Sequence, residues 1–112
     1  MLADRIDALI EDRETASSKA LLAEMEHTLT DGYARALELE AARWRLEKDV
    51  TALATRISTP EEADALRVMV DRLARADREL GQLRTRLQML RRRTDGVRAA
   101  VAAPYAASEA VG

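Results

Sequence analysis

The chain has 112 residues, a net charge of −2, 34% charged and only 3% aromatic residues, and no cysteine. This length favours one domain, and this composition excludes a large aromatic core, a disulfide framework and a thiolate metal site. The longest apolar run is far shorter than the roughly 18 residues of a membrane span. The start of the chain lacks the pattern of a secretory signal, so we expect a cytoplasmic protein with no membrane contact.

Residues 1–14 are predicted to form a short amphipathic helix, because apolar side chains recur on one face. These are Leu2, Ile6, Leu9 and Ile10. Their pattern does not continue into the next segment. We therefore expect a break or bend at residues 15–18, with Ser17 or Ser18 as the N-cap of the following helix.

Two long segments, 18–58 and 60–102, carry apolar residues in alternating steps of three and four. A mean step of 3.5 residues over about five heptads is typical of a coiled coil. The first series is Leu22, Met25, Leu29, Gly32, Ala36, Leu39, Arg43, Leu46, Val50, Leu53 and Ile57. The second is Leu66, Met69, Leu73, Ala76, Leu80, Leu83, Leu87, Leu90, Thr94, Val97 and Val101. We call these residues the seam.

The two segments are joined by a short link around Thr59 and Pro60. Thr59 suits an N-cap, Pro60 suits the first helical position, and Glu62 completes a capping box. Pro60 also disfavours helix at Thr59, so the first long helix should end near Ser58. The prediction is an all-α fold: an antiparallel two-helix coiled-coil hairpin over residues 15–102 with a short N-terminal helix.

Charge also favours antiparallel pairing of the two segments. Residues 1–64 have 15 acidic and 8 basic side chains, whereas residues 65–112 have 5 acidic and 10 basic. Opposite charges beside a seam select orientation. Folding at Thr59 is predicted to place residues 91–93 near Glu24 and Glu26, and residues 84–86 near Asp31.

Irregular seam positions fit the same register. Gly32 is expected opposite Leu87, where it would permit close packing or act as a hinge. Arg43 is expected beside the small Ala76, with Asp77 as its partner.

A single seam leaves other apolar side chains without cover. Tyr33, Leu37, Trp44 and Val70 form the predicted partner interface, for a protein partner or for a homo-oligomer of this chain. Aromatic residues are enriched at such interfaces. The alternative is that the N-terminal helix folds back and covers this stripe.

A second candidate site is a cluster of arginines in the second long segment. Its members are Arg84, Arg86, Arg91, Arg92 and Arg93, with Arg98 nearby. Such a cluster is a possible phosphate-binding site for nucleic acid or a nucleotide. The acidic first segment beside it, the pI near 5.5 and the lack of interleaved aromatics argue against this function.

The last residues, 103–112, are predicted to form a flexible tail after Pro104. Tyr105 followed by Glu109, just after a helical hairpin, resembles the export signal of type VII secretion substrates, the WXG family. That resemblance implies an exported helical hairpin. The family's Trp-x-Gly turn is replaced here by Trp44-Arg45-Leu46 within the first long helix.

No pattern in the sequence predicts catalysis. His27 is the single histidine, no Glu-x-x-His pair builds a di-metal site, and the glycines form no phosphate loop. We therefore expect no catalytic residues, no metal and no cofactor. The function predicted from sequence is a non-catalytic protein-interaction module, acting as an adaptor, scaffold or regulator.

Overall fold

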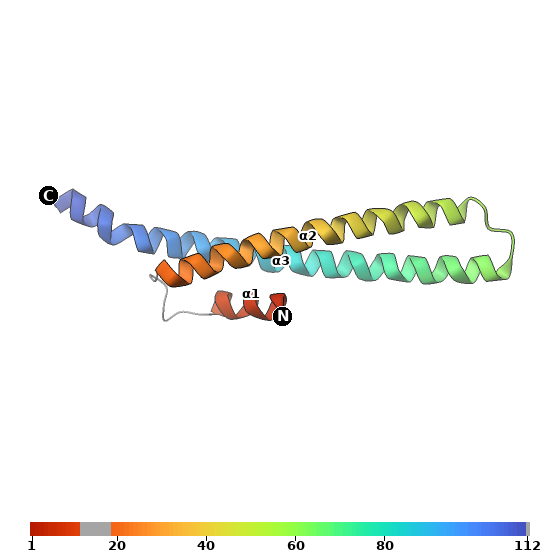
Figure 1. Cartoon of the computed structure of the whole chain (residues 1–112), viewed down its shortest axis with the longest axis horizontal. Coiled ribbons are helices and arrows are strands. Elements are labelled where there is room, and N and C mark those ends of the chain that lie inside the picture. Colours follow the sequence, from red (N-terminus) through yellow and green to blue (C-terminus); the bar gives the residue numbers. More distant parts are fainter. Residues whose placement is uncertain (12–18, 112) are drawn as a thin grey trace. The chain divides into compact units, whose positions relative to one another are not determined.

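In a computed structural model, residues 1–11 and 19–111 are described, with side chains through residue 103. These residues form three helices and no strand: α1 (Leu2–Glu11), α2 (Lys19–Ala54) and α3 (Pro60–Val111) (Figure 1). The all-α prediction is therefore confirmed for this part of the chain. The break predicted at residues 15–18 lies outside the described residues.

The chain divides into two compact units. The first, which we call the three-helix unit, comprises Met1–Ala34 and Leu83–Gly112. The second, the hairpin unit, comprises Arg35–Gln82. Helices α2 and α3 contribute to both units, whereas α1 belongs only to the first.

The three-helix unit has a well-buried core. Ile6 and Leu9 of α1 are buried, as the spacing of their amphipathic face predicts. The apolar residues buried with them in this unit are Leu21, Met25, Leu29, Leu83, Leu87, Leu90 and Val97. Thr94 is fully buried, and its hydroxyl donates to the carbonyl oxygen of Leu90 at 2.7 Å, which satisfies the polar atom.

Ion pairs connect α1 to both long helices. Arg5 donates to Asp31 of α2 at 2.9 Å, and Arg86 of α3 donates to Asp7 at 3.3 Å. The prediction that residues 84–86 lie near Asp31 therefore misplaced the partner of Arg86. The physical reason is that Arg5 and Asp7 of α1 lie beside the two long helices and pair with Asp31 and Arg86.

Gly32 marks a close approach between α2 and α3, as the register predicted. A Cβ atom built at Gly32 would lie 2.3 Å from Cδ2 of Leu87. Leu87 is itself buried, so its side chain has little freedom to retreat. The close packing interpretation of Gly32 is favoured by this contact.

The hairpin unit contains the second part of α2 and the first part of α3. Arg43 bonds to Asp77, the partner expected from sequence, and also lies 3.5 Å from Glu47. The hydrogen bond to Asp77 is the main reason that the pKa of Arg43 is raised. Arg35 bonds to Glu79 at 3.3 Å. In these pairs the later residue of α2 meets the earlier residue of α3, so the two segments are antiparallel.

The turn has the capping interactions that its sequence predicts. The backbone N–H of Glu62 donates to the hydroxyl of Thr59 at 3.1 Å, and α3 begins at Pro60. The carboxylate of Glu62 accepts from the hydroxyls of Ser58 and Thr59. Helix α2 ends at Ala54, four residues before the predicted end, and the hydroxyl of Thr55 caps the carbonyl oxygen of Ala52.

The end of α3 differs from the prediction. The helix continues through Pro104 to Val111, rather than ending at residue 102. A proline removes one backbone hydrogen bond, but the neighbouring alanines are strong helix formers.

Replacing glycine by alanine should separate packing from helix propensity. Gly32→Ala should lower stability, because overpacking against Leu87 outweighs the roughly 1 kcal/mol gained in helix propensity. Gly96→Ala is the matched control, since a Cβ there meets nothing within 4 Å, and it should raise stability by about 1 kcal/mol. Urea unfolding followed by circular dichroism measures both changes. Equal stabilisation by the two substitutions would contradict close packing at Gly32.

The N-terminal cap of α3 predicts a pH dependence. The hydroxyl of Ser58, followed by that of Thr59, holds the pKa of Glu62 below its ordinary value. A folded-state pKa below the unfolded one gives stability that is fully present above the unfolded pKa, near 4.3, and is lost as pH falls through the folded pKa. Glu62→Gln should therefore lower the melting temperature slightly at pH 7 and leave it unchanged at about pH 2. An equal deficit at both values would show that the carboxylate charge is not involved.

Candidate functional site

Several large apolar side chains are exposed on the two long helices. Leu37 is 66% exposed, Trp44 59% and Val70 45%, and all three belong to the hairpin unit. Val68 of the same unit is 50% exposed. Large exposed apolar side chains of this kind are candidates for an interaction surface. The structure thus leaves three of the four predicted interface residues accessible within one unit.

Tyr33 stands apart from these residues. It lies in the three-helix unit, is 41% exposed, and its hydroxyl accepts a hydrogen bond from Arg91 at 3.5 Å. This bond is the main cause that raises the pKa of Arg91. The sequence placed Tyr33 in one stripe with Leu37 and Trp44, but its polar end is engaged by α3.

The exposure of Leu37 and Trp44 follows from their position on α2. They are seven residues apart, so they share a face, and neither occupies a seam position. In this unit four seam residues are buried, namely Ala36, Leu39, Leu53 and Leu80. The other apolar seam residues with partial cover are Leu46, Val50, Leu66, Met69, Leu73 and Ala76, which are half-buried. No described residue of a third helix belongs to the hairpin unit, so both the seam and the flanking face retain contact with solvent.

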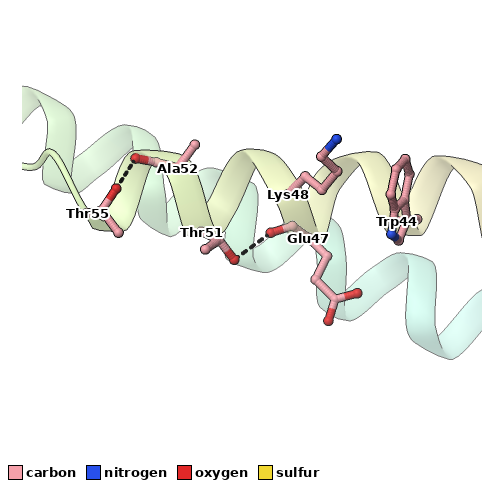
Figure 2. Close-up of a pocket in the computed structure, with 6 residues that line it drawn as sticks. All are labelled: Trp44, Glu47, Lys48, Thr51, Ala52 and Thr55. Carbon is pink, nitrogen blue, oxygen red and sulfur yellow. Dashed lines mark hydrogen bonds between the residues drawn. The ribbon is translucent and has the colours of Figure 1, made fainter.

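An open groove of about 340 Å³ runs beside Trp44 (Figure 2). Its six lining residues all come from α2: Trp44, Glu47, Lys48, Thr51, Ala52 and Thr55. The ammonium of Lys48 lies 4.4 Å from the centre of the Trp44 ring, which is a cation–π contact. Thr51 donates to the carbonyl oxygen of Glu47 at 2.9 Å, so its hydroxyl is already satisfied within the helix.

Lys48 is a residue of this candidate site that the sequence did not single out. Its signal was available, because a lysine four residues after a tryptophan can reach the ring on the helix surface. This contact places the positive charge of Lys48 over one face of the Trp44 indole. The groove therefore combines an apolar wall with a cation.

Helix α1 and Trp44 belong to different units. The alternative that the N-terminal helix covers the predicted stripe stays a prediction. The contacts of α1 itself are those within its own unit. Its apolar residues Ile6 and Leu9 are buried in the three-helix unit, where its charges also find Asp31 and Arg86.

The arginines of α3 are distributed around the helix. Successive residues of an α-helix point about 100° apart, so Arg91, Arg92 and Arg93 leave α3 in three directions. Arg91 contacts Tyr33, and Arg86 contacts Asp7. Arg84 also takes part in an interaction within the chain. This arrangement does not focus the five predicted side chains on a single phosphate.

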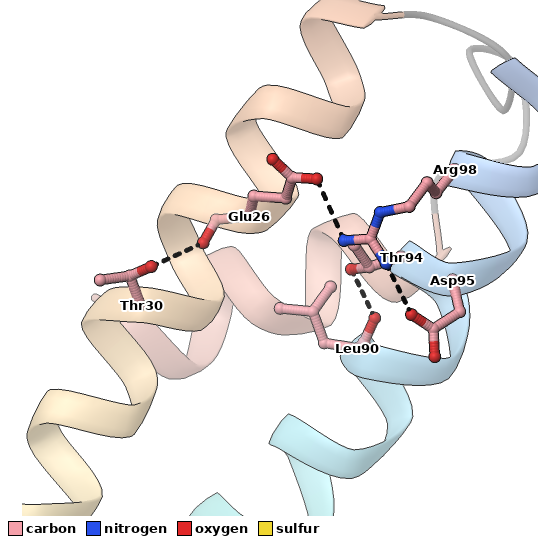
Figure 3. Close-up of polar contacts among 6 residues, drawn as sticks. All are labelled: Glu26, Thr30, Leu90, Thr94, Asp95 and Arg98. Atoms are coloured by element: carbon pink, nitrogen blue, oxygen red, sulfur yellow. Dashed lines mark hydrogen bonds and ion pairs between the residues drawn. The ribbon is translucent and has the colours of Figure 1, made fainter. Parts of the chain in front are cut away.

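Arg98 has the ionic role that was expected of residues 91–93. It donates to Glu26 of α2 at 3.1 Å and to Asp95 of α3 at 3.0 Å (Figure 3). The ionic partner of Glu26 is thus Arg98, five to seven residues beyond the arginines that the sequence placed near it. The long side chain of an arginine can reach from α3 to a residue of α2 that is not directly opposite it. An alignment that pairs only directly opposite residues does not predict such a contact.

Among the described residues, no group of three histidine, cysteine or acidic side chains is arranged to hold a metal ion. His27 lies 3.6 Å from Asp31 on the exposed surface. The side chains of Tyr105 and Glu109, which carry the resemblance to secretion substrates, lie outside the described part.

None of the described helices is long and apolar enough to cross a membrane. The chain matches no protein-family profile, and no curated protein or solved structure is significantly similar to it.

Reversing the charge of Arg98 should separate a structural from a phosphate-binding role. Arg98→Glu should lower stability by roughly 0.5–1 kcal/mol, because the new carboxylate faces Glu26 and Asp95. Adding Glu26→Arg should restore much of the loss. Thermal unfolding at low salt measures both. If the cluster instead binds phosphate, the single change should abolish a salt-sensitive affinity for oligonucleotides, and the second change should rescue nothing.

Proposed function

We propose that this protein is a non-catalytic protein-interaction module that binds its partner through the exposed face of the hairpin unit. The observation that carries this proposal is the exposure of Leu37 and Trp44 on one face of α2. Helical interaction modules recognise partners through such apolar faces. An adaptor, scaffold or regulatory role is compatible with this mode of binding.

The proposal includes coiled-coil packing of α2 against α3. Support comes from the seam spacing and from antiparallel ion pairs such as Arg43–Asp77. Part of the seam in the hairpin unit, including Leu46 and Leu73, is only half-buried and stays in contact with water. A partner helix laid along it would bury additional apolar area, each fully buried leucine or valine contributing about 1.5–3 kcal/mol.

Trp44 is the residue expected to dominate binding. Tryptophan is the residue type most enriched among side chains whose truncation costs more than 2 kcal/mol at interfaces. Its contact with Lys48 holds one ring face, and the groove beside it offers room for a partner side chain. The surrounding charges, Glu47 and Lys48, would set the orientation of the partner.

Site-specific photo-crosslinking in the native cell tests this function. A photoreactive residue at Leu37 should form discrete protein adducts, and Trp44→Ala should reduce their yield several-fold, because the main anchor is lost. The matched control is a photoreactive residue at Arg75, which is also exposed and on the hairpin unit but carries no large apolar neighbour. Adducts are identified by mass and peptide sequencing. Equal, diffuse labelling from both positions would refute the proposed binding face.

A further inference from the structure

The residues of α3 beside the exposed face of the hairpin unit indicate which kind of molecule binds there. This inference rests on the proposed function. Within the hairpin unit, α2 carries the large residues Leu37 and Trp44 seven positions apart. Helix α3 carries the small residues Ala74 and Gly81, also seven positions apart and also exposed. A Cβ built at Gly81 meets no atom within 4 Å, so this stretch of α3 has open space in front of it.

Both stripes lie on the same side of the hairpin unit. Arg43 bonds to Asp77 and lies 3.5 Å from Glu47, so the edges of α2 and α3 that carry these carboxylates face the same way. Trp44 precedes Glu47 by three residues, and Ala74 precedes Asp77 by three. Residues three apart are neighbours on a helix surface, so Trp44 and Ala74 border this common side.

The residues of the two stripes also lie at matching positions along the helix axes. We call two residues level when they lie at the same position along these axes. Arg43 and Asp77 fix which residues of the antiparallel helices are level. Counting away from them in opposite directions, Trp44 is level with Ala74 to within about one turn. In the same way, Leu37 is level with Gly81, and Lys48 is level with Asp71.

We propose that the occupant is a second copy of this chain, related by a two-fold axis parallel to the helices. Rotation about such an axis leaves every residue at the same position along the helix axes. Helix α2 of each copy then lies beside α3 of the other copy, and all neighbouring helices are antiparallel. Leu37 and Trp44 then meet the small Gly81 and Ala74 of the second copy. The result is a four-helix bundle formed by two hairpin units.

Charge complementarity supports this occupant. Lys48 of one copy is level with Asp71 of the other, and the symmetry makes this ion pair twice. The hairpin unit has 9 basic and 10 acidic side chains, so two copies carry almost no net repulsion. Small residues opposite large ones also allow two helices to approach closely.

Charge exchange in the full-length purified chain tests the pairing. Sedimentation equilibrium should give a dimer, and the emission of Trp44, the single tryptophan, should shift to shorter wavelength as the concentration rises. Lys48→Glu and Asp71→Lys should each weaken the dimer by about tenfold, and their combination should restore most of it. Arg75→Glu is the matched charge-reversal control and should leave the dimer intact.

A second variant keeps the test decisive if charge reversal disturbs folding. Gly81→Lys removes a glycine from a helix, so it should preserve or raise helix content while blocking the approach of Leu37 from the second copy. The expected result is a folded chain with self-association lowered by tenfold or more. A chain that stays monomeric at high concentration, or a dimer unaffected by Gly81→Lys and by both charge reversals, would overturn this inference. Adducts from Leu37 to a different protein, with a monomeric purified chain, would sustain the proposed function alone.

Discussion

Two α-helices can bury only one seam between them, and this limit governs the whole chain. In the three-helix unit, α1 adds a third surface, and seam residues such as Met25 and Leu90 become fully buried. In the hairpin unit, Leu39, Leu53 and Leu80 are buried, but other seam residues such as Leu46 and Leu73 remain half-buried. The same heptad spacing therefore gives a fuller core where a third helix packs, and it leaves more of the seam in contact with solvent where only two helices pack.

The charges of the chain mainly determine which surfaces meet. Arg5 and Asp7 of α1 bind Asp31 and Arg86, which orients a helix of only ten residues. Each such pair is largely exposed, and exposed pairs contribute about 0–1 kcal/mol, so burial of Ile6 and Leu9 holds α1 in place. The ion pairs select the docking position. On the hairpin unit, Lys48 places a positive charge over the exposed ring of Trp44.

Exposure of a large aromatic residue has a cost that a binding function explains. An uncovered Trp44 promotes non-specific association, and nothing in the fold of the hairpin unit requires a tryptophan there. The ammonium of Lys48 lies over one face of this ring. The proposed two-fold arrangement would remove this exposed surface with residues that the chain itself supplies, namely Ala74, Gly81 and Asp71.

The sequence by itself determined the helices, the turn at Thr59 and the contacts of Gly32 with Leu87 and of Arg43 with Asp77, because heptad spacing and capping act locally or along one register. The exposed set of Leu37, Trp44 and Val70 also followed from this spacing. Only the tertiary structure decided where α1 packs, and hence that Arg86 meets Asp7. Only the tertiary structure paired Glu26 with Arg98. These contacts depend on the docking of a separate helix and on the reach of long side chains, which periodicity does not encode.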